Sequence, residues 1–155
     1  MEQRQGPFPS PSFLKQLGAN DPSPMVALVS GELTTNVSGA PIGVFNFAGK
    51  VSRVWISLEG SGKDDTDDLS VTADAKINGT TCLTTQPIIA HVSGEASTTK
   101  TTKVAVDTGV TQAVIDGDAN DGSPGDVLSF DMALTRVTPD TEMRNFVIAV
   151  EIEPV

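Results

Sequence analysis

Strict alternation of apolar and polar residues is the most informative pattern in this 155-residue sequence. It is clearest over residues 69–77, where single polar residues separate the apolar ones. The apolar set is Leu69, Val71, Ala73, Ala75 and Ile77. Because successive side chains of a β-strand point to opposite faces, this period of two predicts a strand with one buried and one solvated face. The Asn78-Gly79 pair that follows predicts a tight hairpin turn.

Two more alternating segments predict strands near the C-terminus. Their inward-facing sets are Leu128, Phe130, Met132 and Leu134, and then Phe146, Ile148, Val150 and Ile152. Weaker strand candidates are residues 26–29, 42–47, 51–58, 87–92, 103–106 and 111–115. About eight or nine short strands, bounded by Gly, Asp, Asn and Pro, are typical of an antiparallel β-sandwich or jelly roll. A parallel sheet would need crossover helices, and the pattern predicts none. We therefore expect an all-β, antiparallel sandwich of jelly-roll type.

The first 24 residues differ from the rest of the chain. Five prolines in this stretch exclude it from the interior of a sheet. We therefore expect a Pro-rich N-terminal arm over residues 1–24 and a sandwich domain over residues 25–155. Apolar side chains fall on one side of a short helical turn within the arm. The arm is either a frayed tail or an attachment segment that docks on a partner, since exposed apolar side chains are costly. The docking residues would be Phe13, Leu14 and Leu17, with Phe8 in support.

The charge balance narrows the choice of partners. Twenty acidic residues against ten basic ones give a formal net charge of −10. Such a chain is repelled by phosphate backbones and by anionic membrane surfaces, so nucleic acid and membranes are not expected partners. No apolar run approaches the ~18 residues that would span a bilayer. The N-terminus also lacks the basic and apolar regions of a secretory signal, so we expect a soluble product of a cytoplasm.

Few residues offer catalytic chemistry. The chain has one histidine, His91, one cysteine, Cys82, and no Gly-x-Ser-x-Gly motif. A satisfied or surface histidine and a small buried cysteine are the expected roles, and we do not expect an enzyme. The single tryptophan, Trp55, is expected to fill the core or an interface rather than to serve as a ligand platform.

Two acidic loops could bind a cation. Clustered carboxylates repel one another unless solvent or a cation screens them, and Ca²⁺ accepts six to eight oxygens. The candidates are Asp64, Asp65 and Asp67 in the first loop and Asp116, Asp118 and Asn120 in the second. The second triplet matches the start of an EF-hand loop, but Asp121 occupies the place of the required glycine and no glutamate closes the loop. The pattern favours solvated acidic turns, so no cofactor is expected and calcium is the alternative.

Two stretches carry a resemblance to a known class of proteins. They are residues 55–81, WISLEGSGKDDTDDLSVTADAKINGTT, and residues 123–136, SPGDVLSFDMALTR, with the closing segment 145–154, NFVIAVEIEP. Together they resemble small virion structural proteins of tailed bacteriophages, of the kind that decorate or cement the capsid. The resemblance covers most of the chain after Met25 and leaves the arm uncovered.

The resemblance implies a β-rich capsid decoration protein, often a homotrimer, located on the virion surface after synthesis in the host cytoplasm. The implied partner is the major capsid protein, with the arm reaching a neighbouring capsid subunit. The alternative function is that of a head fibre or receptor-binding domain for host-surface adhesion. That domain could be calcium-assisted, with both acidic loops at its distal tip.

Overall fold

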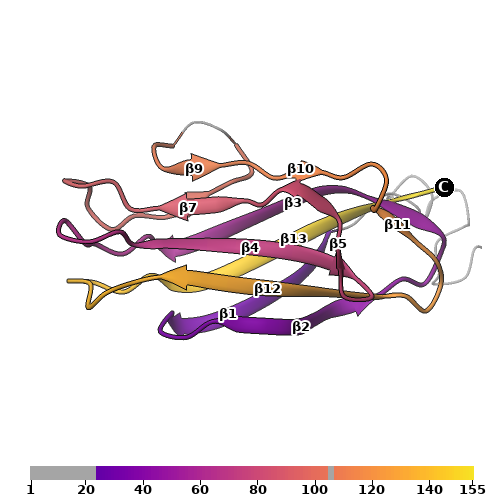
Figure 1. The fold of residues 1–155 in the computed structure, drawn as a ribbon, viewed down its shortest axis with the longest axis horizontal. Coiled ribbons are helices and arrows are strands. Elements are labelled where there is room, and N and C mark those ends of the chain that lie inside the picture. Colours follow the sequence, from indigo (N-terminus) through magenta and orange to yellow (C-terminus); the bar gives the residue numbers. More distant parts are fainter. Residues whose placement is uncertain (1–23, 105–106) are drawn as a thin grey trace, which may run out of the picture.

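Two antiparallel β-sheets stack face to face in the computed structural model, which describes residues 24–104 and 107–155 (Figure 1). The predicted all-β antiparallel sandwich is confirmed, and the described part of the chain contains no helix. It accordingly contains no helix long and apolar enough to cross a membrane.

The first sheet, sheet A, has the order β1-β13-β3-β11, and β8 pairs separately with β3. Its strands are β1 (Met25–Glu32), β13 (Arg144–Pro154), β3 (Gly49–Gly60), β11 (Asp121–Gly122) and β8 (Lys100–Thr101). The second, sheet B, has the order β2-β12-β4-β7-β9, and β5 pairs with β4. Its strands are β2 (Val37–Val44), β12 (Val127–Thr135), β4 (Ser70–Ile77), β7 (Ile88–Ala90), β9 (Val110–Thr111) and β5 (Thr80–Thr81). A separate pair joins β10 (Val114–Ile115) to β6 (Leu83–Thr85).

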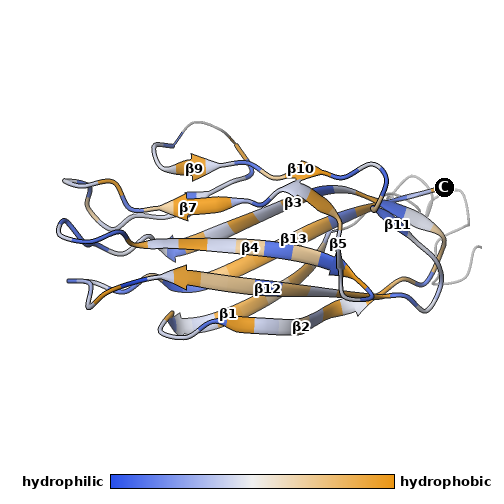
Figure 2. Ribbon diagram, viewed as in Figure 1, coloured by the Kyte–Doolittle hydropathy of each residue, from blue (hydrophilic) through white to orange (hydrophobic). Residues whose placement is uncertain are grey.

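The core lies between the sheets and contains the residues that the alternation selected. The buried side chains of the three long predicted strands are Val71, Ala73, Ala75, Ile77, Leu128, Phe130, Met132, Phe146, Ile148, Val150 and Ile152. Apolar and polar positions alternate visibly along β4 (Figure 2). The rings of Phe130 on β12 and Phe146 on β13 stack with centroids 5.9 Å apart, so this aromatic pair joins the two sheets.

The predicted hairpin turn is confirmed. Asn78 and Gly79 have φ angles of 49° and 83° and connect β4 to β5, with Ile77 opposite Thr80. Positive φ at both central residues is the geometry that favours Asn-Gly, because asparagine tolerates the left-handed region and glycine has no Cβ to clash there.

Three of the weaker strand predictions need correction. The strand predicted at 42–47 is β2, which ends at Val44 because Phe45 turns into the core. The segment predicted at 111–115 is split into β9 and β10, which pair with different strands, β7 and β6. In the region predicted at 103–106, residues 103 and 104 form a turn after the short strand β8, and residues 105–106 lie outside the described part.

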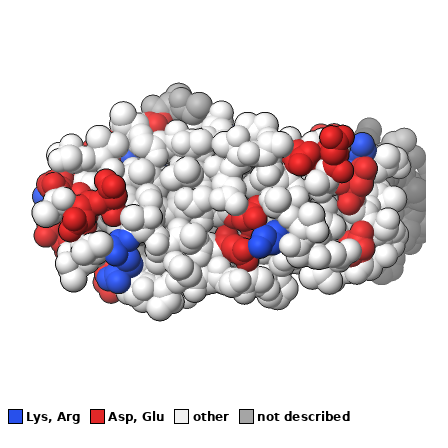
Figure 3. Space-filling view, in the orientation of Figure 1, with Lys and Arg blue, Asp and Glu red and all other residues white. Residues whose placement is uncertain are grey.

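The sandwich has two distinct ends. Met25, where β1 begins, is paired with Val150 near the end of β13, so residue 25 and the last residues of the chain lie at the same end. The β3–β4, β7–β8 and β12–β13 connections lie at the opposite end (Figure 1). On the face formed by sheet B, acidic side chains gather toward both ends, with one further charged group between them (Figure 3).

Candidate functional site

Residues 1–23 of the predicted arm lie outside the described residues, which begin at residue 24. Its docking residues Phe8, Phe13, Leu14 and Leu17 therefore remain a prediction. The candidates that the structure does place are the acidic loops, the histidine, the cysteine and the tryptophan.

Two carboxylates of the first acidic loop, those of Asp64 and Asp65, accept hydrogen bonds from nearby groups. Asp64 is buried, and its Oδ1 accepts the backbone N–H groups of Thr66 and Asp67 at 3.0 and 2.9 Å. Asp65 accepts the Gly94 N–H at 2.8 Å, and its carboxylate lies 3.1 Å from His91 Nε2. The Gly94 N–H and then the His91 hydrogen bond lower the pKa of Asp65. The loop is thus a hydrogen-bonded turn, in which Asp67 is exposed.

The second acidic loop is built in a similar way. Asp116 Oδ1 accepts the Asp118 N–H at 3.0 Å, and the buried Asn120 donates its side-chain amide to the Val51 carbonyl at 2.8 Å. Within residues 24–104 and 107–155, no three His, Cys, Asp or Glu side chains are grouped so that they could hold a metal ion.

The two acidic loops do not share one tip. Residues 121 and 122 pair with Lys50 and Gly49 at the start of β3, whereas residues 61–68 follow Gly60 at the end of that strand. Because β3 is twelve residues long and runs the length of sheet A, the loops lie at opposite ends of the sandwich. The placement of both at one distal tip is therefore wrong, since sequence separation alone does not tell which strand end a loop caps.

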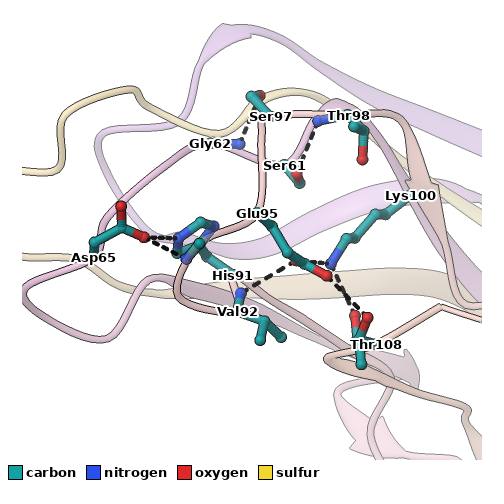
Figure 4. Close-up of polar contacts among 11 residues, drawn as sticks. Ser61, Gly62, Asp65, His91, Val92, Glu95, Ser97, Thr98, Lys100 and Thr108 are labelled. Carbon is teal, nitrogen blue, oxygen red and sulfur yellow. Dashed lines mark hydrogen bonds and ion pairs between the residues drawn. The ribbon is translucent and has the colours of Figure 1, made fainter.

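A polar network joins the loops at the end opposite residue 25 (Figure 4). The Lys100 side chain, 5% exposed, donates to Glu95 at 2.6 Å and to the Thr108 carbonyl at 2.8 Å. The Thr108 hydroxyl donates to the other Glu95 oxygen at 2.9 Å. The Lys100 hydrogen bond, followed by that of Thr108, lowers the pKa of Glu95. Each group has its partner, so the network fastens the 91–99 loop to β8.

His91 belongs to the same end of the molecule. Its side chain is 1% exposed, and its Nε2 lies against the Asp65 carboxylate (Figure 4). Among the described residues, Asp65 is its only side-chain hydrogen-bond partner, while Nδ1 is buried without one. No described hydroxyl or thiol is hydrogen-bonded to the imidazole, as a nucleophile activated by it would be.

Cys82 is fully buried, which confirms the predicted role of a small core residue. Its thiol donates to the Ala75 carbonyl at 3.3 Å. Burial raises the pKa of the thiol to about 12, so the reactive thiolate is scarce at neutral pH.

The most distinctive surface is the outward side of sheet A. Five apolar residues occupy adjacent outward positions on β1, β13 and β3, and we call them the sheet A face: Val26, Leu28, Val147, Ala149 and Trp55. Ala149 is covered and only 2% exposed, whereas Val147 and Trp55 are half-buried. Val26 and Leu28 are 55% and 61% exposed, large values for aliphatic side chains. A contiguous apolar area of this kind is typical of an interaction site on a protein.

A shallow groove of about 470 Å³ crosses the sheet A face. Its walls include Leu28, Val147 and Ser57, and it ends at Glu59, Thr99 and Asn145. Leu28, Val147 and Ser57 face one another across the three strands in register. The groove therefore offers apolar sides and a polar end.

Trp55 lies on this outward side, so of the two roles expected for it, in the core or at an interface, the core is wrong. Val54 and Ile56, its neighbours on β3, are buried between the sheets, so the period of two directs Trp55 outward. Two cations lie against the indole: Lys103 Nζ is 4.7 Å and Arg53 Cζ 5.4 Å from the ring centroid. Arg53 also donates to the Lys103 carbonyl at 2.7 Å, which holds the two side chains together.

The sheet A face continues to an open edge. On its side away from β13, β1 pairs with no described strand. Residues 25–31 of β1 contain neither a charge nor a proline, which are the usual guards of an exposed edge. β1 does end at Glu32, after an irregularity in its pairing with β13, but the corresponding edge strand of sheet B, β2, has a proline, Pro41, within the strand. An unguarded edge suits pairing with another chain.

The sequence analysis did not predict the sheet A face, because it sought a single apolar face on each strand. The signal was present in VALV at 26–29 and FVIAV at 146–150, where apolar residues occupy both alternating sets. Strands of this kind are apolar on both faces, which an ordinary solvated sheet does not require.

Comparison with protein-family models, curated proteins and solved structures finds no match for this chain.

Proposed function

We propose that this chain is a structural virion protein that decorates a phage capsid and stabilises it by binding the major capsid protein. The observation that carries the proposal is the order of the strands in the two sheets. That order supports a jelly roll, and jelly rolls are a common architecture of viral capsid domains. The sequence resemblance points to the same class of proteins.

The order becomes clear when eight strands are counted along the chain as β1, β2, β3, β4, β7, β8, β12 and β13. Sheet A then has the order first, eighth, third, sixth, and sheet B the order second, seventh, fourth, fifth. Consecutive strands therefore alternate between the sheets, except for the hairpin-like step from β4 to β7. This alternation supports the proposed jelly roll, in which two Greek keys interlock.

The two ends of the sandwich suit attachment through the proposed arm. The body begins at Met25, at the end of the molecule away from the 61–68 and 91–99 loops. An arm anchored on the shell by Phe8, Phe13, Leu14 and Leu17 would hold that end toward the capsid. The sheet A face with its open edge would then contact a neighbouring copy or capsid subunit, and we propose that the assembly is a homotrimer. No enzymatic step is needed for this role.

The decisive experiment is binding to purified expanded heads. We compare the full chain, a variant lacking residues 1–24, and a full-length variant with Phe13→Ser, Leu14→Ser and Leu17→Ser, and we measure bound copies by co-sedimentation. Lys15→Ser is the matched control within the arm. Both arm variants should lose binding, whereas the control should bind normally.

Light scattering on the same samples tests the assembly, and a molar mass of three chains is expected. Circular dichroism shows whether each variant is folded. If the truncated and triple variants occupy heads as fully as the parent chain, the arm is not the anchor. If the full chain binds no heads at all, the proposed function is wrong.

A further inference from the structure

The cations of this acidic protein are distributed unevenly. Ten Lys and Arg residues occur in the sequence, and two of them, Arg4 and Lys15, lie outside the described residues. Of the eight described, six lie within 4 Å of a carboxylate. Within the described residues the two others are Arg53 and Lys103, and both lie against Trp55.

This cluster presents hydrogen-bond donors to solvent. The Lys103 ammonium can donate three hydrogen bonds, and the guanidinium of Arg53 donates one of its five to the Lys103 carbonyl. The Trp55 indole N–H adds a donor with no acceptor among the described residues. Glu151 lies opposite Arg53 in the β13–β3 register, but it is not within ion-pair distance. A ligand for this cluster must therefore supply acceptors, and an anion does so best.

The surroundings of the cluster are apolar. In register, Trp55 is followed across the sheet by Ala149 and then Val26. The next row, two residues further along β3, is the groove with Leu28 and Val147. A small inorganic anion would leave this apolar surface unused, whereas an extended peptide with acidic and apolar residues would cover both parts.

We infer that Trp55, Arg53 and Lys103, with the adjoining groove, form a binding site for an acidic, extended segment of a partner protein. A carboxylate of the segment binds between Arg53 and Lys103 at the edge of the indole, and its apolar side chains lie over Val147 and Leu28. This inference rests on the proposed function, because the partner is taken to be a protein, and it adds the chemistry of the segment recognised.

The sequence provides a selective assay for this site. Trp55 is the only tryptophan and the chain has no tyrosine, so tryptophan fluorescence reports on this site alone. The probe is a capped hexapeptide of alternating leucine and glutamate, titrated into the full chain. The comparison ligands are the same peptide with glutamine for glutamate, and sodium sulfate.

The acidic peptide should shift Trp55 emission in a saturable manner, with weaker binding at higher salt. Arg53→Gln with Lys103→Gln should weaken binding at least tenfold, whereas Lys50→Gln, a paired cation elsewhere on β3, should leave it unchanged. Leu28→Ser should weaken it without abolishing the response to the carboxylates. Melting curves confirm that each variant is folded.

Several results would overturn the inference. If the glutamine peptide binds as tightly as the acidic one, or if the double variant binds like the parent, the cations do not select the ligand. An equal response to sulfate would show an anion site with no preference for a protein segment. Trp55 emission could also change with protein concentration when no peptide is present. If the molar mass rises as well, the site binds a second copy of the chain. Because heads take no part in this assay, its failure and that of the capsid proposal are distinguishable.

Discussion

The stacked pair formed by Phe130 and Phe146 should be a principal contact between the two sheets. Phe146 is fully buried on β13, Phe130 is almost so on β12, and their rings are 5.9 Å apart with planes inclined by 23°. Truncation of a buried phenylalanine to alanine costs about 3–5 kcal/mol, since it loses burial and leaves a cavity. Such a loss is a large fraction of the ~5–15 kcal/mol that stabilises a domain.

Substitution of either phenylalanine by leucine measures the contact better than truncation to alanine. It keeps much of the side-chain volume but removes the ring, so each variant should lose about 1–3 kcal/mol and remain folded. Aromatic pairs contribute about 0.5–1.5 kcal/mol beyond their burial. The variant with both Phe130→Leu and Phe146→Leu should therefore be more stable than the sum of the single losses predicts, by that amount.

The assay measures the free energy of unfolding in urea, with Trp55 fluorescence as the signal. It compares the parent, both single variants and the double variant. Val137→Ala is the control, because Val137 is 56% exposed and should change stability by less than about 0.5 kcal/mol. A coupling energy indistinguishable from zero would refute the stacking contribution. A loss for Phe146→Leu no larger than that of the control would refute the placement of this ring in the core.

Four further results are expected. Cys82 should react with a thiol reagent only as fast as the protein unfolds, because burial raises its pKa to about 12; rapid reaction of the native protein would contradict this. Glu95→Gln should destabilise the fold by about 2–3 kcal/mol in thermal or urea unfolding, because it leaves the buried Lys100 ammonium without its carboxylate. Folding lowers the pKa values of Asp65 and Glu95, so both carboxylates stabilise the folded protein. Their contribution to the free energy of unfolding is complete above the unfolded pKa of about 4 and is lost as the pH falls through the folded pKa values. A Tm that stays constant from pH 7 to pH 3 would contradict this contribution. Added calcium should leave the Tm unchanged relative to chelator, because the Asp64 carboxylate already accepts two backbone N–H groups; a rise of several degrees would indicate a site.

The long strands could be predicted from the sequence because their signal is local. In β4, β12 and β13 every second residue packs between the sheets, so the pattern can be recognised from the residues of each strand alone. The Asn78-Gly79 turn is local in the same sense, since its two positive φ angles require those residue types. These elements alone determine the fold class.

The short strands depend on partners that are remote in sequence. Val110 and Val114 are close together in one apolar stretch, yet they pair with Ile89 and Thr85 in different parts of the fold. No property of residues 111–115 by themselves marks the point where the chain changes partner. The side on which Trp55 lies was similarly ambiguous, because it is fixed by Val54 and Ile56 occupying the interior.

The candidate site depends on the same kind of remote information. Arg53 and Trp55 are two residues apart on β3, and their shared face could be predicted from the alternation. Lys103 reaches the indole only because β8 pairs with β3 at Ser57 and Leu58. That neither cation has a carboxylate partner among the described residues can be recognised only after the six other ion pairs are placed.

The distribution of charge explains how the chain can carry an apolar face and an unguarded edge. Acidic residues in the loops at both ends contribute to the net charge of −10, which keeps free copies apart. The two cations beside Trp55 attract an acidic partner to that face. The acidic ends of two copies, in contrast, repel each other. Neutralising the acidic loops with Asp67→Asn, Asp68→Asn and Asp118→Asn should therefore increase self-association at low salt, measured by light scattering. If it does not, edge pairing at β1 is not restrained by charge.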